Sequence, residues 1–295
     1  MPSTELAGNK VHLDQSDYDQ NLIHFKLIAE LARLRAPRSI LACPFGRLVL
    51  DVYPWTDVTI DVFYGGGDES LIDIPAEGEC HELVVLRGAV DLAMAGVSAP
   101  LAHADAKLVR FADRAPYTIS SLPGAAPILL RYRHRRRGGC LDFQPGRLRH
   151  LQAWQGIAGV GDVVRRHADD RGRRYGDVFS TEKGDINITW AYPGVITAWH
   201  AHAAQDDNWF VIGGALKVGL ATRGEQGFES RFVHCSEYEQ TALQIPVQVL
   251  HGWRNMTGQE AILMYYITRK YDPANPDELR YSLDEVGADW STPVH

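Results

Sequence analysis

Four side chains can bind a metal ion or move a proton: His200, His202 and Asp207, which stand in one short stretch, and His251 farther along the chain. His200 and His202 are separated by one residue, so on a β-strand both imidazoles would lie on the same face. Three imidazoles and one carboxylate form a complete ligand set for Fe, Mn, Ni or Zn. The same groups can instead take up and release protons. The residue types alone do not separate these two kinds of site.

Short strands are predicted to position these residues. From Ile40 onward, apolar or alternating runs such as VTIDVFY, ELVVL, INITW and AILMYYI are separated by Gly, Pro and Asp. Such runs at regular spacing are typical of a β-sandwich or a β-barrel. Before them, residues 16–35 carry apolar side chains at helical spacing until Pro37 ends the pattern, which predicts an amphipathic helix. The fold is therefore expected to be all-β with a short N-terminal helix.

Two stretches of the sequence occur twice, in the same order. HELVVLRGAVDL at 81–92 matches DNWFVIGGALKV at 207–218, and GAAPILLRYR at 124–133 matches GQEAILMYYI at 258–267. The offsets between the copies are 126 and 134 residues, so the second copy carries an eight-residue insertion. Self-similarity of this kind indicates a duplicated structural unit. The repeat predicts two copies of one β-module.

The first copy lacks the ligand set of the second. By the two offsets, Ile74 and Ala76 stand in place of the two spaced histidines. His81 stands in place of Asp207, and Tyr117 stands in place of the third histidine. The first copy is therefore predicted to be a degenerate barrel without chemistry. The predicted organisation is an N-terminal helical segment at 1–37, a degenerate barrel at 38–137, a linker at 138–159 and a barrel with the site at 160–295.

The composition is that of an ordinary globular protein, with 45% hydrophobic and 23% charged residues. A formal net charge of -7 argues against a nucleic-acid partner. No run approaches the roughly 20 apolar residues that span a bilayer, so we expect no membrane partner and a cytoplasmic location. The four cysteines form no CxxC pair, which favours free thiols. An arginine-rich stretch between Arg131 and Arg174 indicates either a solvated linker or an anion site.

The spacing of the site residues resembles the two motifs of the cupin superfamily. The spaced histidines are followed by four residues, an acidic residue, six residues and Gly214. The second stretch reads P-x4-H-x3-N, with Pro246, His251 and Asn255. The resemblance implies a small antiparallel jelly-roll barrel. Together with the repeat, it implies a bicupin of two such barrels.

Residues 160–295 resemble, more narrowly, the dTDP-4-dehydrorhamnose 3,5-epimerases. HADDRG, PGVITAWH, IPVQVLHGW, ITRKYDP and DEVGADW occur in the order of that family's segments. The resemblance implies acid–base chemistry without a cofactor on a 4-keto-hexose linked to a nucleotide. It implies that His200 is the base and Tyr271 the acid. It also implies that His251 is a second active-site histidine and that Arg171 binds phosphate.

Further side chains near the motifs are candidates for binding the sugar nucleotide. Gln205 and Asn208 can donate hydrogen bonds to hydroxyl groups. At least one of Trp199 and Trp209 is expected near the cavity, where an indole can stack on a ring. The candidate substrate-binding residues are Arg171, His202, Gln205, Asn208, Trp209 and Asn255. We also expect a homodimer.

Two positions depart from the epimerase pattern. Asp207 stands where that family has a lysine that stabilises the enolate. The aspartate that orients the base would fall on Leu283, with Asp284 next to it. The HAH triplet, in addition, resembles the nucleotide-sugar 3,4-ketoisomerases.

Three functions therefore stay open. The first is a cofactor-free epimerase or isomerase. The second is a metal-dependent cupin, an oxygenase or isomerase. The third is a non-catalytic carbohydrate-binding protein. The metal ligands in the second would be His200, His202, Asp207 and His251.

Overall fold

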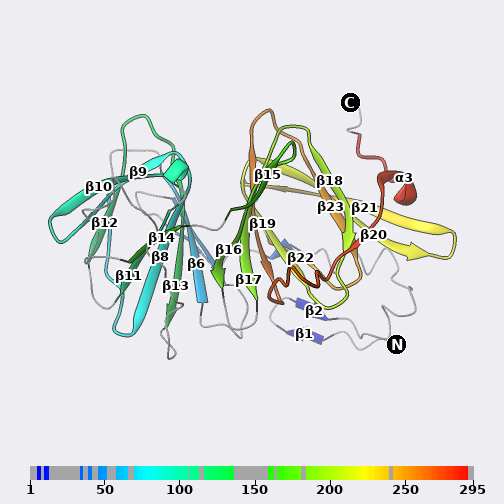
Figure 1. Ribbon diagram of the computed structural model, residues 1–295, viewed down its shortest axis with the longest axis horizontal. Helices are drawn as coiled ribbons and strands as arrows, with labels where there is room; N and C mark the ends of the chain where they lie inside the picture. Colours follow the sequence, from blue (N-terminus) through cyan, green and yellow to red (C-terminus); the bar gives the residue numbers. More distant parts are fainter. Residues whose placement is uncertain are drawn as a thin grey trace. The chain divides into compact units, whose positions relative to one another are not determined.

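The fold was obtained as a computed structural model, and almost all of its regular structure is β-strand (Figure 1). Contacts divide the chain into two compact units: residues 37–164 form one, and residues 1–36 with 165–295 form the other. Among the described residues, no helix has the length and apolar character that crossing a bilayer requires. The described residues are 5–7, 10–12, 34–35, 39–41, 46–51, 58–65, 70–105, 107–112, 116–135, 159–162, 165–180, 184–238 and 242–291.

The unit formed by residues 37–164 consists of two antiparallel sheets, of order β10-β9-β12-β7 and β14-β11-β8-β13-β6-β5-β4. Alternating burial along strands such as β9 points one set of side chains into the core and the other set away from it. The elements are β4 (Ser39–Leu41), β5 (Gly46–Asp51), β6 (Val58–Tyr64), β7 (Ser70–Asp73), β8 (Glu79–Arg87), β9 (Ala89–Met94), β10 (Val97–Ala102), η1 (His103–Asp105), β11 (Lys107–Ala112), β12 (Tyr117–Ser121), β13 (Ile128–Arg135) and β14 (Gly159–Asp162).

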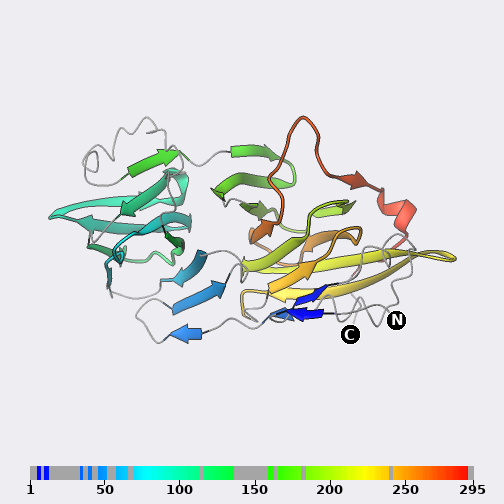
Figure 2. The same ribbon diagram turned by 90° about the horizontal axis from the view of Figure 1, so that it is seen from below.

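The other unit has the same plan, with sheets of order β15-β16-β17-β24-β19-β22-β3 and β21-β20-β23-β18-β25. The long hairpin of β20 and β21 is drawn in yellow in Figure 2. Its elements are β1 (Glu5–Ala7), β2 (Lys10–His12), β3 (Leu34–Arg35), β15 (Arg165–Asp169), β16 (Gly172–Ser180), β17 (Asp185–Ala191), β18 (Ile196–Ala201), β19 (Asp207–Gly213), β20 (Ala215–Gly224), β21 (Gly227–Ser236), β22 (Ala242–Ile245), β23 (Leu250–Asn255), β24 (Ala261–Ile267), β25 (Leu279–Arg280) and α3 (Leu283–Val286). The predicted all-β bicupin of two jelly-roll units is confirmed.

The prediction of an N-terminal helix is wrong for its last two residues, 34 and 35. Leu34 and Arg35 form the strand β3, which pairs with β22 at the edge of a sheet. Pairing satisfies the backbone groups that an edge strand leaves open, and here it prevails over the helical spacing of side chains. The rest of the predicted helix, residues 16–33, lies outside the described residues. So does the predicted linker, except for Gly159, which begins β14.

Short signals of the sequence account for the C-terminal helix α3, which was not predicted. Ser282 caps it by accepting from the backbone of Glu285, whose side chain accepts in return from the Ser282 amide. Gly287 ends it with a φ of 67°, a value that favours glycine. Of the cysteines, Cys80 and Cys235 are buried, while Cys43 and Cys140 lie outside the described residues.

A buried network of charges lies in the interior of the unit formed by residues 37–164, beside its hydrophobic core. Arg131, which is 1% exposed, donates through Nε to Asp61 at 2.7 Å. Its Nη1 donates to Asp73 and, at 2.9 Å, to the hydroxyl of Tyr117. The Tyr117 hydroxyl also lies 2.8 Å from Nδ1 of His81. The arginine-rich stretch that begins at Arg131 was predicted to be a solvated linker or an anion site. For Arg131 this prediction is wrong, because carboxylates of the same unit enclose its guanidinium.

Strand register also corrects one position of the repeat. Tyr117 pairs with Asp73 in the first unit, as His251 pairs with His200 in the second. Asp73 therefore stands at the position of His200, and Ile74 does not. A constant offset could not reveal this shift, because Asp73 precedes His81 by eight positions whereas His200 precedes Asp207 by seven.

Candidate active site

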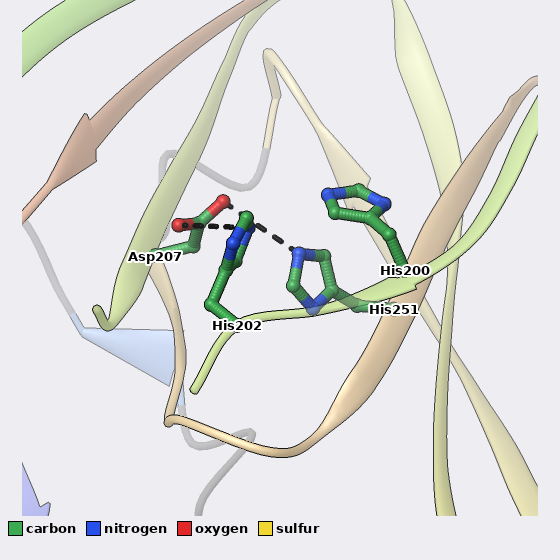
Figure 3. Close-up of side chains that lie close together, drawn as sticks. All are labelled: His200, His202, Asp207 and His251. Atoms are coloured by element: carbon green, nitrogen blue, oxygen red, sulfur yellow. Dashed lines mark ion pairs between the residues drawn. The ribbon is translucent and has the colours of Figure 1, made fainter. Parts of the chain in front are cut away.

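Three strands of the C-terminal unit bring the predicted cluster together. β18 carries His200, β19 begins at Asp207, and β23 carries His251. His202 follows directly after β18. One ligand atom from each of the four side chains lies within 4.8 Å of the others, and Figure 3 shows the four side chains converging. The proximity that the motif spacing predicted is therefore present.

Backbone carbonyls fix the orientation of two of the imidazoles. Nδ1 of His251 lies 2.8 Å from the carbonyl of Val249, and Nδ1 of His202 bonds the carbonyl of Asp277. A carbonyl can only accept, so each Nδ1 carries a proton, and Nε2 is the nitrogen that each ring turns toward Asp207. These Nε2 atoms lie 3.6 Å and 3.7 Å from the carboxylate of Asp207. In the described part of the chain, Nε2 of His251 is buried with no hydrogen-bond partner.

Asp207 is the anion of the cluster. It is 3% exposed and accepts hydrogen bonds from Nε2 of Gln205 at 2.9 Å and Nε1 of Trp209 at 3.0 Å. Burial raises the pKa of Asp207, but its contact with His251 and the neighbouring histidines outweighs burial and holds that pKa well below the usual range. The carboxylate is thus ionised at neutral pH.

His200 is the uncharged member of the cluster. Burial, and then the neighbouring His251 and His202, lower its pKa well below the usual value, so the ring is neutral at pH 7. Its ring centroid lies 4.1 Å from that of His251. The predicted orienting carboxylate does not contact it: Asp284 is exposed on α3, and no ion pair or hydrogen bond in the described ranges joins the two. The short helix holds Asp284 in its solvent-exposed first turn.

The cluster opens into a cavity of about 290 Å³ between the two sheets. Predicted residues that line it are Arg171, His200, His202, Gln205, Asp207, Trp209 and Tyr271. Trp199 faces the other side of β18, where its ring centroid lies 5.1 Å from that of Trp290. The expectation that Trp199 or Trp209 is near the cavity is therefore met by Trp209.

Two predicted substrate-binding residues do not line the cavity. The side-chain amide of Asn255 donates to the carbonyls of Ala191 and Gln259, and its oxygen accepts from Thr257. The amide of Asn208 donates to the carbonyl of Tyr266 at 3.3 Å. Both amides are used within the fold, so we assign neither a contact with substrate.

The residues that line the cavity without having been predicted include three with chemically active side chains. Arg174 and Arg280 add positive charge, and Tyr265 adds a buried phenol. The Arg174 guanidinium lies 5.4 Å from the ring centroid of Tyr265 and 5.8 Å from that of Tyr271. The predicted phosphate ligand Arg171 is paired with Asp169 at 2.6 Å. Every second side chain of a strand lies on the same face, and in β24 these are Leu263, Tyr265 and Ile267, which all line the cavity. This period of two was the sequence signal that could have identified Tyr265.

Comparisons with known proteins found relatives that match part of the chain and solved structures that match more of it. A spore coat polysaccharide biosynthesis protein of Bacillus subtilis, SpsL, is 34% identical over 139 residues, which cover 44% of this chain and 92% of SpsL. A probable low-salt glycan biosynthesis epimerase of Haloferax volcanii, Agl13, is 32% identical over 143 residues, 44% of this chain and 90% of Agl13. Among solved structures, a Bacillus subtilis oxalate decarboxylase variant is 10% identical, covering 83% of this chain and 77% of its own, with a TM-score of 0.47.

One family pattern matches residues 167–279, which contain the whole four-residue cluster and most of the cavity lining. The match to SpsL covers nearly all of that relative and lies above 30% identity. Through its C-terminal unit, the chain therefore belongs to the polysaccharide biosynthesis C-terminal domain family.

Proposed function

We propose that the C-terminal unit is a sugar epimerase or isomerase acting on a keto-hexose linked to a nucleotide. The observation that carries this proposal is a neutral, half-buried His200 that opens into a cavity bordered by arginines. The names of SpsL and Agl13, a polysaccharide biosynthesis protein and a probable epimerase, support a sugar substrate. The resemblance of residues 160–295 to the dTDP-4-dehydrorhamnose epimerases supports the 4-keto group and the nucleotide.

Each group has a chemical task in this reaction. A proton on a carbon next to a ketone is removed by a base, and the negative charge moves to the ketone oxygen. His200 is the base, because a neutral imidazole has a free lone pair for that proton. His202 lies beside it, with its ring centroid 5.1 Å from that of His200, and borders the same cavity. The arginines Arg171, Arg174 and Arg280 bind the phosphates of the nucleotide, since guanidinium groups match phosphate geometry.

A specific observation favours a metal-assisted form of this site as a second candidate. His202 and His251 both direct Nε2 toward Asp207, and the buried Nε2 of His251 finds no hydrogen-bond partner in the described residues. Together with His200 they would hold a divalent ion such as Fe, Mn, Ni or Zn. A bound ion supplies positive charge to a substrate oxygen. Without it, the ionised Asp207 would repel the charge that develops on the ketone oxygen.

The test uses dTDP- and UDP-4-dehydro-6-deoxyglucose in D₂O, with NMR following deuterium entry next to the ketone. We expect exchange by the wild type and loss of exchange in His200→Gln. His234→Gln is the matched control, because His234 is exposed on β21 of the same unit. Metal analysis of the purified protein, followed by chelation and re-addition of each ion, separates the two candidates. Tight binding of both nucleotides without exchange would instead indicate a non-catalytic carbohydrate-binding protein.

A further inference from the structure

Tyr265 occupies the wall of the cavity that faces His200. It lies on β24 of one sheet, whereas His200 lies on β18 of the other. Both side chains line the same cavity. Tyr265 is 9% exposed, and its neighbour Tyr266 does not line the cavity because successive side chains of a strand point to opposite faces.

The first unit shows how far a long side chain at the position of Tyr265 can reach. Arg131 pairs with Leu83 on the neighbouring strand, as Tyr265 pairs with Trp209. The offset of 134 residues also relates Arg131 to Tyr265. Arg131 is therefore the structural counterpart of Tyr265.

The contacts of Arg131 cross the interior of its unit. Its guanidinium donates to Asp73 and to Tyr117, which stand at the positions of His200 and His251. A long side chain at this position thus spans the space between the sheets. In the second unit the shorter phenol of Tyr265 points across the same space, and the cavity remains between it and the histidines.

The surroundings of Tyr265 hold its ring in place and keep it protonated. Arg174 packs over the ring, and the Thr189 side chain shares a hydrogen bond with the hydroxyl. Burial raises the pKa of Tyr265 to about 12, so the hydroxyl keeps its proton at neutral pH. Tyr271 is 39% exposed, so its phenol is the more solvated of the two.

We propose that Tyr265 is the catalytic acid that protonates the substrate carbon from the face opposite His200. This assignment rests on the proposed function. His200 breaks the C–H bond and takes the proton, and the electron pair forms the enolate. The enolate carbon then takes the proton of the Tyr265 hydroxyl, which forms the new C–H bond with inverted configuration. The phenolate regains a proton from water and His200 releases one to water, so the reaction consumes no co-reactant.

The experiment separates the two proton transfers with the dTDP and UDP substrates in D₂O. In Tyr265→Phe, we expect deuterium exchange next to the ketone to persist while epimer formation falls by about 100-fold or more. Persisting exchange also reports that the site is folded. Thr189→Val, which removes the hydrogen-bond partner of the hydroxyl, should lower epimer formation with exchange retained. The matched control is Tyr266→Phe, on the same strand with the opposite orientation, which should match the wild type.

Tyr271, the acid that the family resemblance implies, is tested in the same assay. Tyr271→Phe should lower epimer formation by less than about tenfold, chiefly through a higher KM. Exchange without epimer formation in Tyr271→Phe, with Tyr265→Phe fully active, would overturn the assignment and leave the proposed function intact. Absence of exchange in the wild type with every substrate would overturn the proposed function, and the assignment with it.

Discussion

Arg131→Met tests whether the buried charges of the first unit hold its two sheets together. Arg131 and Asp61 are 1% and 0% exposed, and their Nη2 and Oδ2 atoms lie 2.6 Å apart. Removing one partner of a buried pair costs about 3–5 kcal/mol, because it leaves an unpaired charge. Arg133 still contacts Asp61 at 2.8 Å in the variant. We therefore expect a loss near the lower end, about 3 kcal/mol.

Urea unfolding measures this loss, and hydrogen exchange followed by mass spectrometry assigns it to residues 37–164. Adding Asp61→Asn to the variant removes the buried carboxylate that has lost Arg131, and it should recover about 1 kcal/mol or more. Arg87→Met is the control, because Arg87 forms no ion pair among the described residues, and it should change stability by less than about 0.5 kcal/mol. A loss below about 1 kcal/mol for Arg131→Met would refute the reasoning.

Three further predictions concern both units. Burial lowers the pKa of His81 to about 4 from its ordinary value of 6.5, so the unfolded chain binds the proton first. The neutral His81 therefore makes its full contribution to the free energy of unfolding above pH 6.5, and this contribution is lost as the pH falls toward 4. His81→Gln should flatten the pH dependence of the free energy of unfolding between pH 6.5 and 4. Gly252→Ala would bring its Cβ within 2.7 Å of the Thr197 carbonyl and the Ala198 Cα, so we expect a loss of about 1–3 kcal/mol in thermal unfolding and reduced exchange activity. Asp207→Ala should lose bound metal and activity together if the site holds an ion, whereas unchanged catalysis after chelation of the wild type would contradict the metal-assisted candidate.

The duplication, the all-β class and the four clustered residues could all be predicted from the sequence. Each rests on a local signal: short apolar runs, a repeated stretch, and the spacing of His200, His202, Asp207 and His251 within strands. Homodimerisation and a cytoplasmic location stay predictions, because the structure of one chain tests neither of them.

Other features required the tertiary structure. All seven residues of β24 are buried, so hydrophobicity could not tell which face of that strand lines the cavity, and Tyr265 went unnoticed. The spacing of the matched residues differs by one position between the copies, so only strand pairing could assign Asp73 to the position of His200.

The same limit applies to single side chains whose partners are distant in the sequence. Arg131 looks like part of a basic run, yet its partners Asp61 and Asp73 lie 70 and 58 residues away. β3 similarly finds its partner β22 in another part of the chain. A local pattern specifies which faces of an element are apolar, but the packing of distant strands decides which residues meet and what charge surrounds them.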